Sequence, residues 1–317
     1  MREINEKKYS AVNIADISAM AENDPEDLVR RSEEYYNNQV ARAAGTIREG
    51  KETTRPYKYI LLCGPSASGK TTTAHKLKQR LIDQGVGARV LSMDNFFKGM
   101  MHYPKLANGS PDMESVHCLD LDLLNESFSE LTRRGNSWFP QFDFNSQEQR
   151  LRSHYVELGD NDVLIMEGIH ALNPMVLSSV PPQTVFRIYV SVRTKFVEGD
   201  EKVLVPKDIR LLRRMVRDSK FRNYPAVYTL RYWDTVVAGE KKNIDPFRDD
   251  VDLKIDNTID YEACVWHHLL REVIPTVGEE DFEEFPQMER VLTALGRFPA
   301  IDPNLIPSDS LLREFIG

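Results

Sequence analysis

The sequence predicts an α/β fold, a three-layer sandwich in which helices cover a parallel sheet of about five strands. Three observations favour it. Short apolar runs alternate with stretches of helical periodicity. A glycine-containing segment, "GPSASGKTTT", joins the first apolar run to the helix that follows. A later amphipathic stretch is unusually rich in arginine, which is typical of a helix that lies over a charged ligand.

The expected strands are short apolar runs, several of them ending at an acidic or glycine residue: 57–63, 88–94, 162–168, 186–192 and 251–256. Amphipathic patterns predict helices over 71–85, 207–222 and 261–277. A further helix is expected over 24–50, where Asp24 can cap and Pro25 suits the first turn. We therefore expect a helical N-terminal extension (1–54), a single α/β domain (55–277) and an acidic C-terminal tail (278–317).

Composition excludes several classes of protein. The chain of 317 residues carries a formal charge of −8, which argues against non-specific binding to nucleic acid or anionic membranes. The three cysteines form no C-x-x-C pair, so neither a disulfide framework nor a zinc site is indicated. The N-terminus lacks an apolar signal core, and no apolar run is long enough to span a bilayer. A soluble cytoplasmic protein is expected, and a homo-oligomeric state stays open.

The segment 64–72 fits the Walker A pattern G-x-x-x-x-G-K-[ST] and predicts a P-loop NTPase-type fold. Tight bends make the backbone N–H groups of such a loop converge on phosphates, and the next helix adds its positive N-terminal end. Lys70 would neutralise the outer phosphates of ATP, and the Thr71 hydroxyl would reach Mg²⁺. The predicted nucleotide-binding residues of this loop are Gly64, Pro65, Ser66, Ala67, Ser68, Gly69, Lys70, Thr71 and Thr72.

Two carboxylates follow predicted strands at the edge of the sheet where ligands gather. Asp94 ends "LSMD", and Glu167 ends "VLIME". With a P-loop present, Asp94 is the candidate base that accepts the proton of an attacking hydroxyl. Glu167 is a candidate ligand of Mg²⁺, together with Thr71 and Asp94. The alternative for Asp94 is an Asx-turn or a helix cap, and for Glu167 it is a surface position in a turn.

The stretch 207–222 places Leu211, Leu212, Met215 and Val216 on one helical face and Arg210, Arg213, Arg214 and Arg217 on the other. Arginines stabilise the charge that spreads over a transferring phosphoryl group, so this helix predicts a lid. A solvated charged face or an RNA-binding patch is the alternative. The aromatics of 224–233 are expected to pack against this helix rather than to form a stacking platform.

Taken together, the loop, "SMDNFF", "FDFNSQEQR" (142–150), "LIMEGIHAL" and the arginine-rich helix resemble the uridine kinase and phosphoribulokinase family. The resemblance covers roughly residues 57–260 and is greatest to a bacterial branch of uridine kinase-like nucleoside kinases. It implies ATP with Mg²⁺ as donor and a nucleoside 5′-hydroxyl as acceptor. It also implies that Asp94 is catalytic and that Glu167 lies at the metal site. The lid residues so implied are Arg214, Arg217 and Arg222. Arg214 and Arg217 are predicted to be catalytic, and Arg213 and Arg222 to bind the nucleotide.

On the acceptor side, the sequence departs from the family pattern. The family's ribose-holding Asp-His-Pro-Asp corresponds to Gly109-Ser110-Pro111-Asp112, which leaves Asp112 as the candidate replacement. The family's base-contacting loop corresponds to 142–150, where Gln147 could hydrogen-bond a base edge. His170 is a candidate substrate contact, although a packed role is favoured because it has no metal partner at ligand spacing. The substrate candidates are Asp112, Phe142, Asp143, Gln147, Arg150 and His170.

Three functions therefore stay open. The first is a kinase acting on the 5′-hydroxyl of uridine, cytidine or another nucleoside. The second is a kinase of a sugar, polyol or sugar phosphate, suggested by the altered ribose and base segments. The third, which the combination of Lys70, Asp94 and Glu167 argues against, is a non-catalytic nucleotide-binding module.

Overall fold

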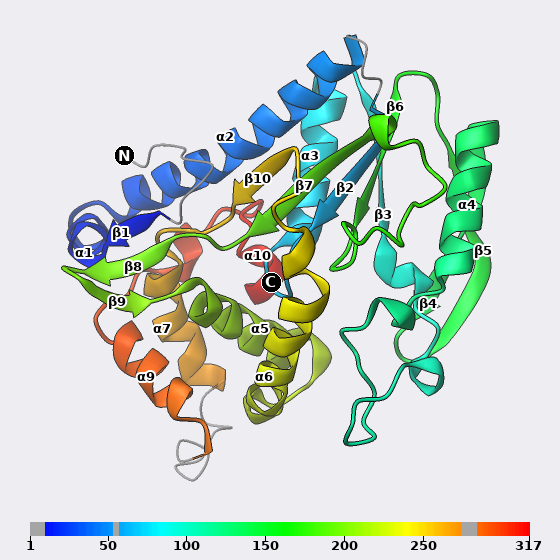
Figure 1. Ribbon diagram of the computed structural model, residues 1–317. Helices are drawn as coiled ribbons and strands as arrows, with labels where there is room; N and C mark the ends of the chain where they lie inside the picture. The colour runs from blue at the N-terminus through cyan, green and yellow to red at the C-terminus, as the bar shows by residue number, and fades with distance from the viewer. Residues whose placement is uncertain (1–9, 53–56, 274–283) are drawn as a thin grey trace.

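The computed structural model describes residues 10–52, 57–273 and 284–317 (Figure 1). Its helices and strands occur in the following order along the chain: β1 (Ala11–Asn13), α1 (Ile14–Asn23), α2 (Pro25–Glu52), β2 (Tyr59–Cys63), α3 (Lys70–Asp83), β3 (Gly87–Ser92), α4 (Leu121–Arg134), β4 (Asn136–Asp143), β5 (Glu148–Glu157), β6 (Asp162–Glu167), β7 (Val185–Ser191), β8 (Lys195–Glu198), β9 (Glu201–Leu204), α5 (Pro206–Arg222), α6 (Ala226–Asn243), β10 (Leu253–Asp256), α7 (Glu262–Val273), α9 (Pro286–Leu295) and α10 (Arg313–Ile316).

The central sheet contains the five strands that the sequence predicts, in the order β10-β7-β2-β6-β3, all parallel. Its middle strand, β2, is buried along its whole length because both faces are covered, as expected for a parallel sheet. The predicted strand 88–94 is too long at its end, because β3 stops at Ser92 and the chain turns at Met93–Phe96.

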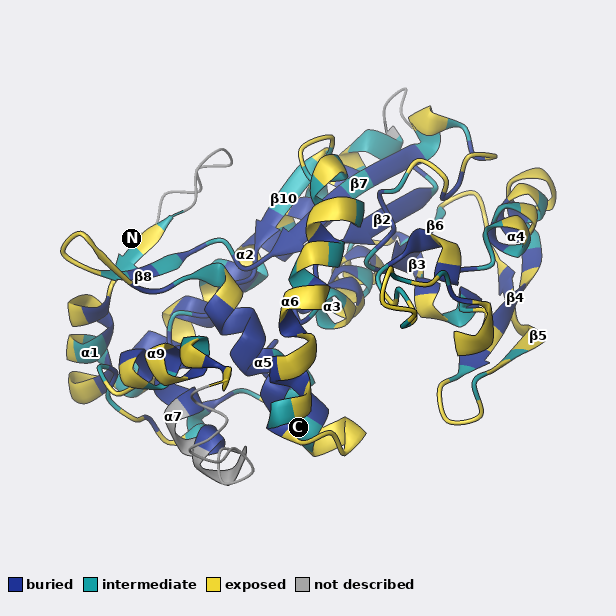
Figure 2. Ribbon diagram, turned by 60° about the horizontal axis from the view of Figure 1, so that its bottom comes forward, coloured by how far each residue is buried: buried dark blue, intermediate teal, exposed yellow. Residues whose placement is uncertain are grey.

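Alternate residues of β2 pack into two separate cores, which defines the three layers. Ile60 and Leu62 face a core that includes α2, α3, α5 and α7. Tyr59 and Leu61 face a second core, where Phe128 of α4 and Phe139 of β4 pack. Figure 2 shows the buried strands at the centre and exposed residues on the outward surfaces of α4 and α6. The predicted three-layer α/β sandwich is confirmed.

Two smaller sheets flank the central one, and the sequence did not predict either. Strands β4 and β5 form an antiparallel hairpin beside α4. Strands β8 and β9 form a second hairpin directly before α5, and β1 adds to it in parallel through Ala11–Asn13 and Lys195–Val197. The segment that leads into the arginine-rich helix is therefore paired with the beginning of the described chain.

Both flanking regions of the chain contribute to the same core as the sheet. Tyr36 of α2 is fully buried, and its hydroxyl is 2.8 Å from the hydroxyl of Thr73 in α3. Leu311, Leu312 and Phe315 are also fully buried in this core. The division at residues 54 and 277 stays a prediction, and residues 274–283, which include most of the acidic stretch, lie outside the described part. Among the helices of the described ranges, none has the length and apolar character needed to cross a membrane.

Candidate active site

The loop between β2 and α3 has the tight geometry that its glycines predict. Gly69 adopts a left-handed conformation (φ 74°) as the N-cap of α3. A Cβ on Gly64 would lie 2.0 Å from the carbonyl oxygen of Val190, so the neighbouring strand β7 excludes any side chain there. Lys70 donates to the carbonyl of Pro65 at 3.0 Å, across the loop, while Thr71 is exposed. The loop therefore brings a lysine and the positive N-terminal end of α3 together, as an anion site requires, while carboxylates of Glu240 and Glu314 accept from the N–H groups of Ser66 and Thr72.

The two predicted carboxylates meet at the edge of the sheet because β6 pairs with both β2 and β3. Glu167 aligns with Leu62 of β2 on one side and with Ser92 of β3 on the other. Asp94 follows Ser92 by two residues, and its backbone N–H donates to the Ser92 hydroxyl at 3.4 Å. Parallel register thus places Glu167 directly beside the strand that leads into the P-loop, with Asp94 next to it.

Electrostatic coupling supports this grouping. Burial and, after it, the negative charge of Asp94 raise the pKa of Glu167 to about 7, against the opposing effect of Lys70. Solvent reaches Asp94, yet enough protein surrounds its carboxylate for desolvation to raise its pKa, with Lys70, Arg222 and Arg217 acting in the opposite direction. Two carboxylates that repel each other supply oxygen ligands of the kind that Mg²⁺ prefers.

Helix α5 brings part of its arginine face to the P-loop. Arg214 donates to the hydroxyl of Ser66 at 2.8 Å. The carboxylate of Asp218, which is buried, lies 2.7 Å from Arg217, 3.3 Å from Arg214 and 3.5 Å from Arg222. Sequence reasoning missed Asp218, although its i, i+4 spacing from Arg214 and to Arg222 is visible in the sequence. Asp218 holds three of the predicted lid arginines together.

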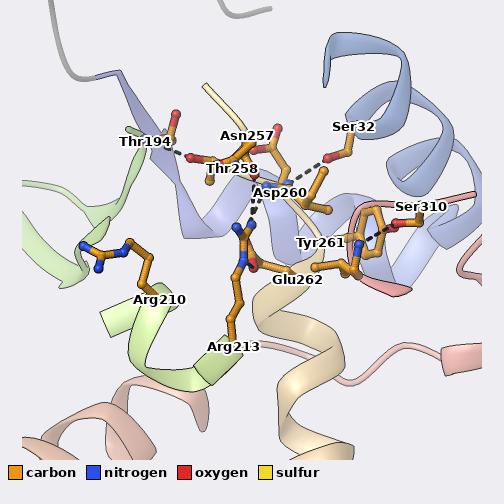
Figure 3. Close-up of polar contacts among 12 residues, drawn as sticks. Ser32, Thr194, Arg210, Arg213, Asn257, Thr258, Asp260, Tyr261, Glu262 and Ser310 are labelled. Carbon is orange, nitrogen blue, oxygen red and sulfur yellow. Dashed lines mark hydrogen bonds and ion pairs between the residues drawn. The ribbon is translucent and has the colours of Figure 1, made fainter. Parts of the chain in front are cut away.

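The other two arginines of α5 are buried in pairs with glutamates. Arg213 donates to both carboxylate oxygens of Glu262 at 2.8 and 2.9 Å, and both side chains are fully buried. Arg210 pairs with Glu240 of α6 and donates to the carbonyl of Ser66 at 2.8 Å. Figure 3 shows Arg213 directed toward Glu262, with Arg210 extending elsewhere. The arginines of the predicted polar face of α5 therefore differ in their environment. Arg213 holds α5 against α7.

Glu240, which the sequence analysis did not select, also contacts the P-loop. Its carboxylate accepts a hydrogen bond from the backbone N–H of Ser66 at 3.0 Å. Three groups of Ser66 are therefore bound: its N–H by Glu240, its carbonyl by Arg210 and its hydroxyl by Arg214. No signal in the sequence marks Glu240, because its partner is distant in the chain.

An aromatic group lies on the acceptor side, next to Asp94. The ring of Phe97 is within 6.0 Å, centroid to centroid, of Tyr103, Phe142 and Phe144. The side chain of Asn95 joins this group to the β4–β5 hairpin, because it accepts from the backbone of Phe142 at 3.4 Å. Asp94 influences the pKa of Tyr103, which places the two side chains near each other. We call Phe97, Tyr103, Phe142 and Phe144 the aromatic cluster.

Four of the remaining substrate candidates have structural partners. Asp143 caps the hairpin turn by accepting from Asn145 at 2.9 Å, and Arg150 lies 3.6 Å from it. The Gln147 amide donates to the carbonyl of Phe144 in the same turn. Asp112 accepts from the backbone of Glu114 at 3.3 Å in the loop before α4. These residues shape the acceptor side, and their contact with substrate remains a prediction.

His170 follows Glu167 in a buried turn. Its side chain is 1% exposed, and neither ring nitrogen has a hydrogen-bond partner within the described ranges. Burial lowers the pKa of His170 to about 4, and the nearby Lys70 acts in the same direction. The imidazole is therefore neutral at physiological pH, as expected for the packed role.

The family model described as "Phosphoribulokinase / Uridine kinase family" matches residues 59–262, the segment that carries the P-loop, both carboxylates and α5. The chain belongs to this family. As a member of the phosphoribulokinase/uridine kinase family, it is a small-molecule kinase with a nucleotide-binding P-loop.

Similar proteins include several uridine kinases at low identity. The uridine kinase of Ureaplasma urealyticum is 24% identical over 179 residues, covering 56% of this chain and 77% of that protein. The uridine kinase of Staphylococcus haemolyticus is 25% identical over 197 residues, covering 62% and 86%. A structure described as a possible uridine kinase from Bacillus stearothermophilus superposes with a TM-score of 0.47 and 18% identity, covering 69% of this chain and 98% of that one.

Proposed function

We propose that this protein transfers the γ-phosphoryl group of ATP to the 5′-hydroxyl of a nucleoside. The observation that carries the proposal is the juxtaposition of three features. The P-loop, the Asp94–Glu167 pair and the aromatic cluster all lie at the carboxyl ends of β2, β6 and β3. The P-loop suits a phosphate donor, and the Asp94–Glu167 pair suits a proton acceptor beside a metal site. The aromatic cluster suits a flat, partly apolar acceptor molecule.

On the donor side, the loop 64–72 would hold the phosphates of ATP, with Lys70 neutralising their charge. Thr71 and Glu167, with Asp94, would hold Mg²⁺, which supplies charge neutralisation on the phosphates. Arg214 already reaches the P-loop through Ser66, and Asp218 links it to Arg217 and Arg222. These arginines would stabilise the negative charge that develops as the phosphoryl group moves.

On the acceptor side, Asp94 would accept the proton of the attacking hydroxyl. Its pKa is raised by desolvation, which makes it a stronger base than an ordinary aspartate. The aromatic cluster would bind the nucleobase by stacking or edge contacts. Gly109 corresponds to the first residue of the family's ribose-holding motif, and as a glycine it has no carboxylate that could hold a ribose. Asp112 is the nearest acidic residue along the chain that could take this role.

The experiment is a screen for ADP release with Mg²⁺ and ATP against nucleosides, pentose phosphates and polyols. We expect turnover with a nucleoside, and its loss when the same base is offered as a 5′-deoxynucleoside, which lacks the acceptor hydroxyl. Turnover only with a sugar phosphate or polyol would replace the nucleoside by that class. Binding of ATP without turnover on any acceptor would favour the non-catalytic alternative.

A further inference from the structure

The short helix α10 lies against the beginning of α3, where the P-loop ends. One carboxylate oxygen of Glu314 accepts from the backbone N–H of Thr72 at 3.0 Å and from its hydroxyl at 2.7 Å. The N–H groups of a helix's first turn have no partner within the helix. In a P-loop, these are the donors that hold phosphate oxygens. A carboxylate of the chain itself thus occupies a phosphate donor of the loop.

Apolar side chains of the same segment cover the loop beside Glu314. The side chain of Leu311 lies so near Gly69 that a Cβ there would be 2.6 Å from its Cδ1. The ring of Phe315 lies 5.2 Å from the Arg213 guanidinium. The amide of Asn257, which also faces Gly69, is fully buried and has no hydrogen-bond partner for its oxygen or nitrogen in the described structure. The segment 311–315 therefore closes one side of the loop.

This segment is attached to the lid helix as well. Lys220, near the end of α5, donates to the carbonyl of Ile316 at 3.3 Å. At its other end, the hydroxyl of Ser310 lies 3.1 Å from that of Tyr261 and also donates to Glu33 of α2. The segment therefore bridges the first turn of α3 and the last turn of α5, with a fixed anchor at Ser310.

The charge of Glu314 opposes the presence of a phosphate. Its carboxylate is near enough to Glu167 to raise the pKa of that residue, so it adds to the negative charge around the site. A phosphate chain that extends from Lys70 past Thr72 would meet both this charge and the volume of residues 311–315. The two occupants of the Thr72 N–H exclude each other.

We propose that residues 311–317 are an intramolecular competitor of the donor nucleotide, in which Glu314 takes the place of a nucleotide phosphate at Thr72. Nucleotide binding displaces Glu314, and the Lys220–Ile316 contact links this displacement to α5. The inference rests on the proposed function, since it concerns the regulation of the same nucleotide site. It predicts that the apparent affinity for ATP is reduced by the free energy of the Glu314 contacts.

The test is equilibrium binding of ATP and ADP to the full chain by calorimetry. We expect Glu314→Gln to bind ATP about tenfold more tightly than the unaltered chain, because a neutral amide competes less well for the N–H donor. Glu289→Gln, an exposed glutamate on α9, is the matched control and should leave the affinity unchanged. Equal or weaker ATP binding by Glu314→Gln would overturn the inference.

A second measurement does not depend on any variant. Hydrogen–deuterium exchange of the amides of 311–317 should become faster when the unaltered chain is saturated with ADP, whereas slower or unchanged exchange would contradict displacement. Lys70→Ala should abolish nucleotide binding, and it therefore shows whether the binding measured in the unaltered chain occurs at the P-loop. Specific binding by the unaltered chain, with no gain in Glu314→Gln, refutes the inference alone. Absence of binding by both the folded chain and Glu314→Gln refutes the inference and the proposed function together.

Discussion

The guanidinium of Arg213 and the carboxylate of Glu262 form a two-hydrogen-bond pair with no solvent exposure, and this pair joins α5 to the first turn of α7. The remaining contacts are also internal: Arg213 donates to the carbonyl of Asn257, and Glu262 accepts from the backbone of Ile259. These contacts offset part of the cost of burying the two charges, although Nη1 of Arg213 has no hydrogen-bond partner in the described structure. The lid helix is therefore fixed at its middle.

The first prediction concerns this pair. Glu262→Gln should lower the free energy of unfolding by about 3–5 kcal/mol, because it leaves the buried charge of Arg213 without a counter-charge. Urea unfolding followed by circular dichroism measures the change. Arg134→Gln, which removes an exposed ion pair with Glu130, is the control and should cost no more than ~1 kcal/mol. Equal effects of the two substitutions would show that Arg213–Glu262 has no special role.

The second prediction tests the catalytic base. Asp94→Asn should lower kcat by about 10²–10⁴-fold, because the amide cannot accept a proton from the acceptor hydroxyl. Binding of ADP should be retained, since no hydrogen bond joins Asp94 to the loop 64–72 in the described structure. Asp122→Asn, at an exposed position of α4, is the control. Normal turnover of Asp94→Asn would remove Asp94 from its assigned role.

The third prediction concerns pH and the metal. The pKa of Glu167 is raised to about 7, and only its deprotonated form can bind a cation. The Mg²⁺ concentration that gives half-maximal turnover should therefore fall as the pH rises from 6 to about 7, and level off above. Kinetic titrations with Mg²⁺ at several pH values measure this trend. A requirement for Mg²⁺ that does not change across this range would exclude Glu167 as a ligand.

The fourth prediction uses Glu114, whose pKa is raised from 4.5 to about 7 by burial, partly opposed by the charge of Arg214. Because the pKa is higher in the folded state than in the unfolded state, ionisation of Glu114 opposes folding. The contribution of Glu114 to the free energy of unfolding is therefore highest at low pH, where its carboxyl is protonated, and falls as the pH rises through about 7. Glu114→Gln should therefore stabilise the fold at pH 8 by no more than ~3 kcal/mol and leave it unchanged at pH 4. Unfolding by urea at both pH values measures it, and a destabilised variant at pH 8 would contradict this account.

The fifth prediction concerns Asp218, which holds Arg214, Arg217 and Arg222. Asp218→Asn keeps the shape but removes the charge that orients the three guanidinium groups. We expect kcat to fall about tenfold with a smaller change in the KM for ATP, because these arginines act on the transition state. Steady-state kinetics at saturating acceptor measures the split. A pure rise in KM with unchanged kcat would instead assign the arginines to ground-state binding.

The central sheet and the grouping of Lys70, Asp94 and Glu167 were predictable because they depend on local patterns and one general rule. Apolar runs give the strands, and parallel register then brings the residues after β2, β3 and β6 to one edge. The arginines of α5 were only half predictable. The periodicity identifies the polar face, yet it cannot show that Glu262 and Glu240 cover Arg213 and Arg210, since both glutamates come from later helices.

The acceptor side was the least predictable part. Phe97 and Phe144 were visible as aromatics, but their approach depends on the β4–β5 hairpin, whose first strand contains Pro140 and has an irregular register after Phe139. The aromatic residues of 224–233 also differ in how far they are buried. Trp233 is buried as expected, whereas Tyr228 and Tyr232 of α6 form an exposed row of neighbouring rings with Tyr224, which precedes the helix. In both cases the tertiary neighbours, and not the local sequence, determine the environment.

The hydrogen bond between Tyr36 and Thr73 has a consequence for how this protein can be handled. The two residues lie in a core that α2, α3 and the segment from Leu311 to Ile316 share, and much of this core lies outside the segment matched by the family model. We therefore expect the unit that unfolds cooperatively to be larger than that segment. Trimming the chain to 59–262 would uncover apolar surface of α3 and α5 together, and we expect such a fragment to aggregate instead of folding.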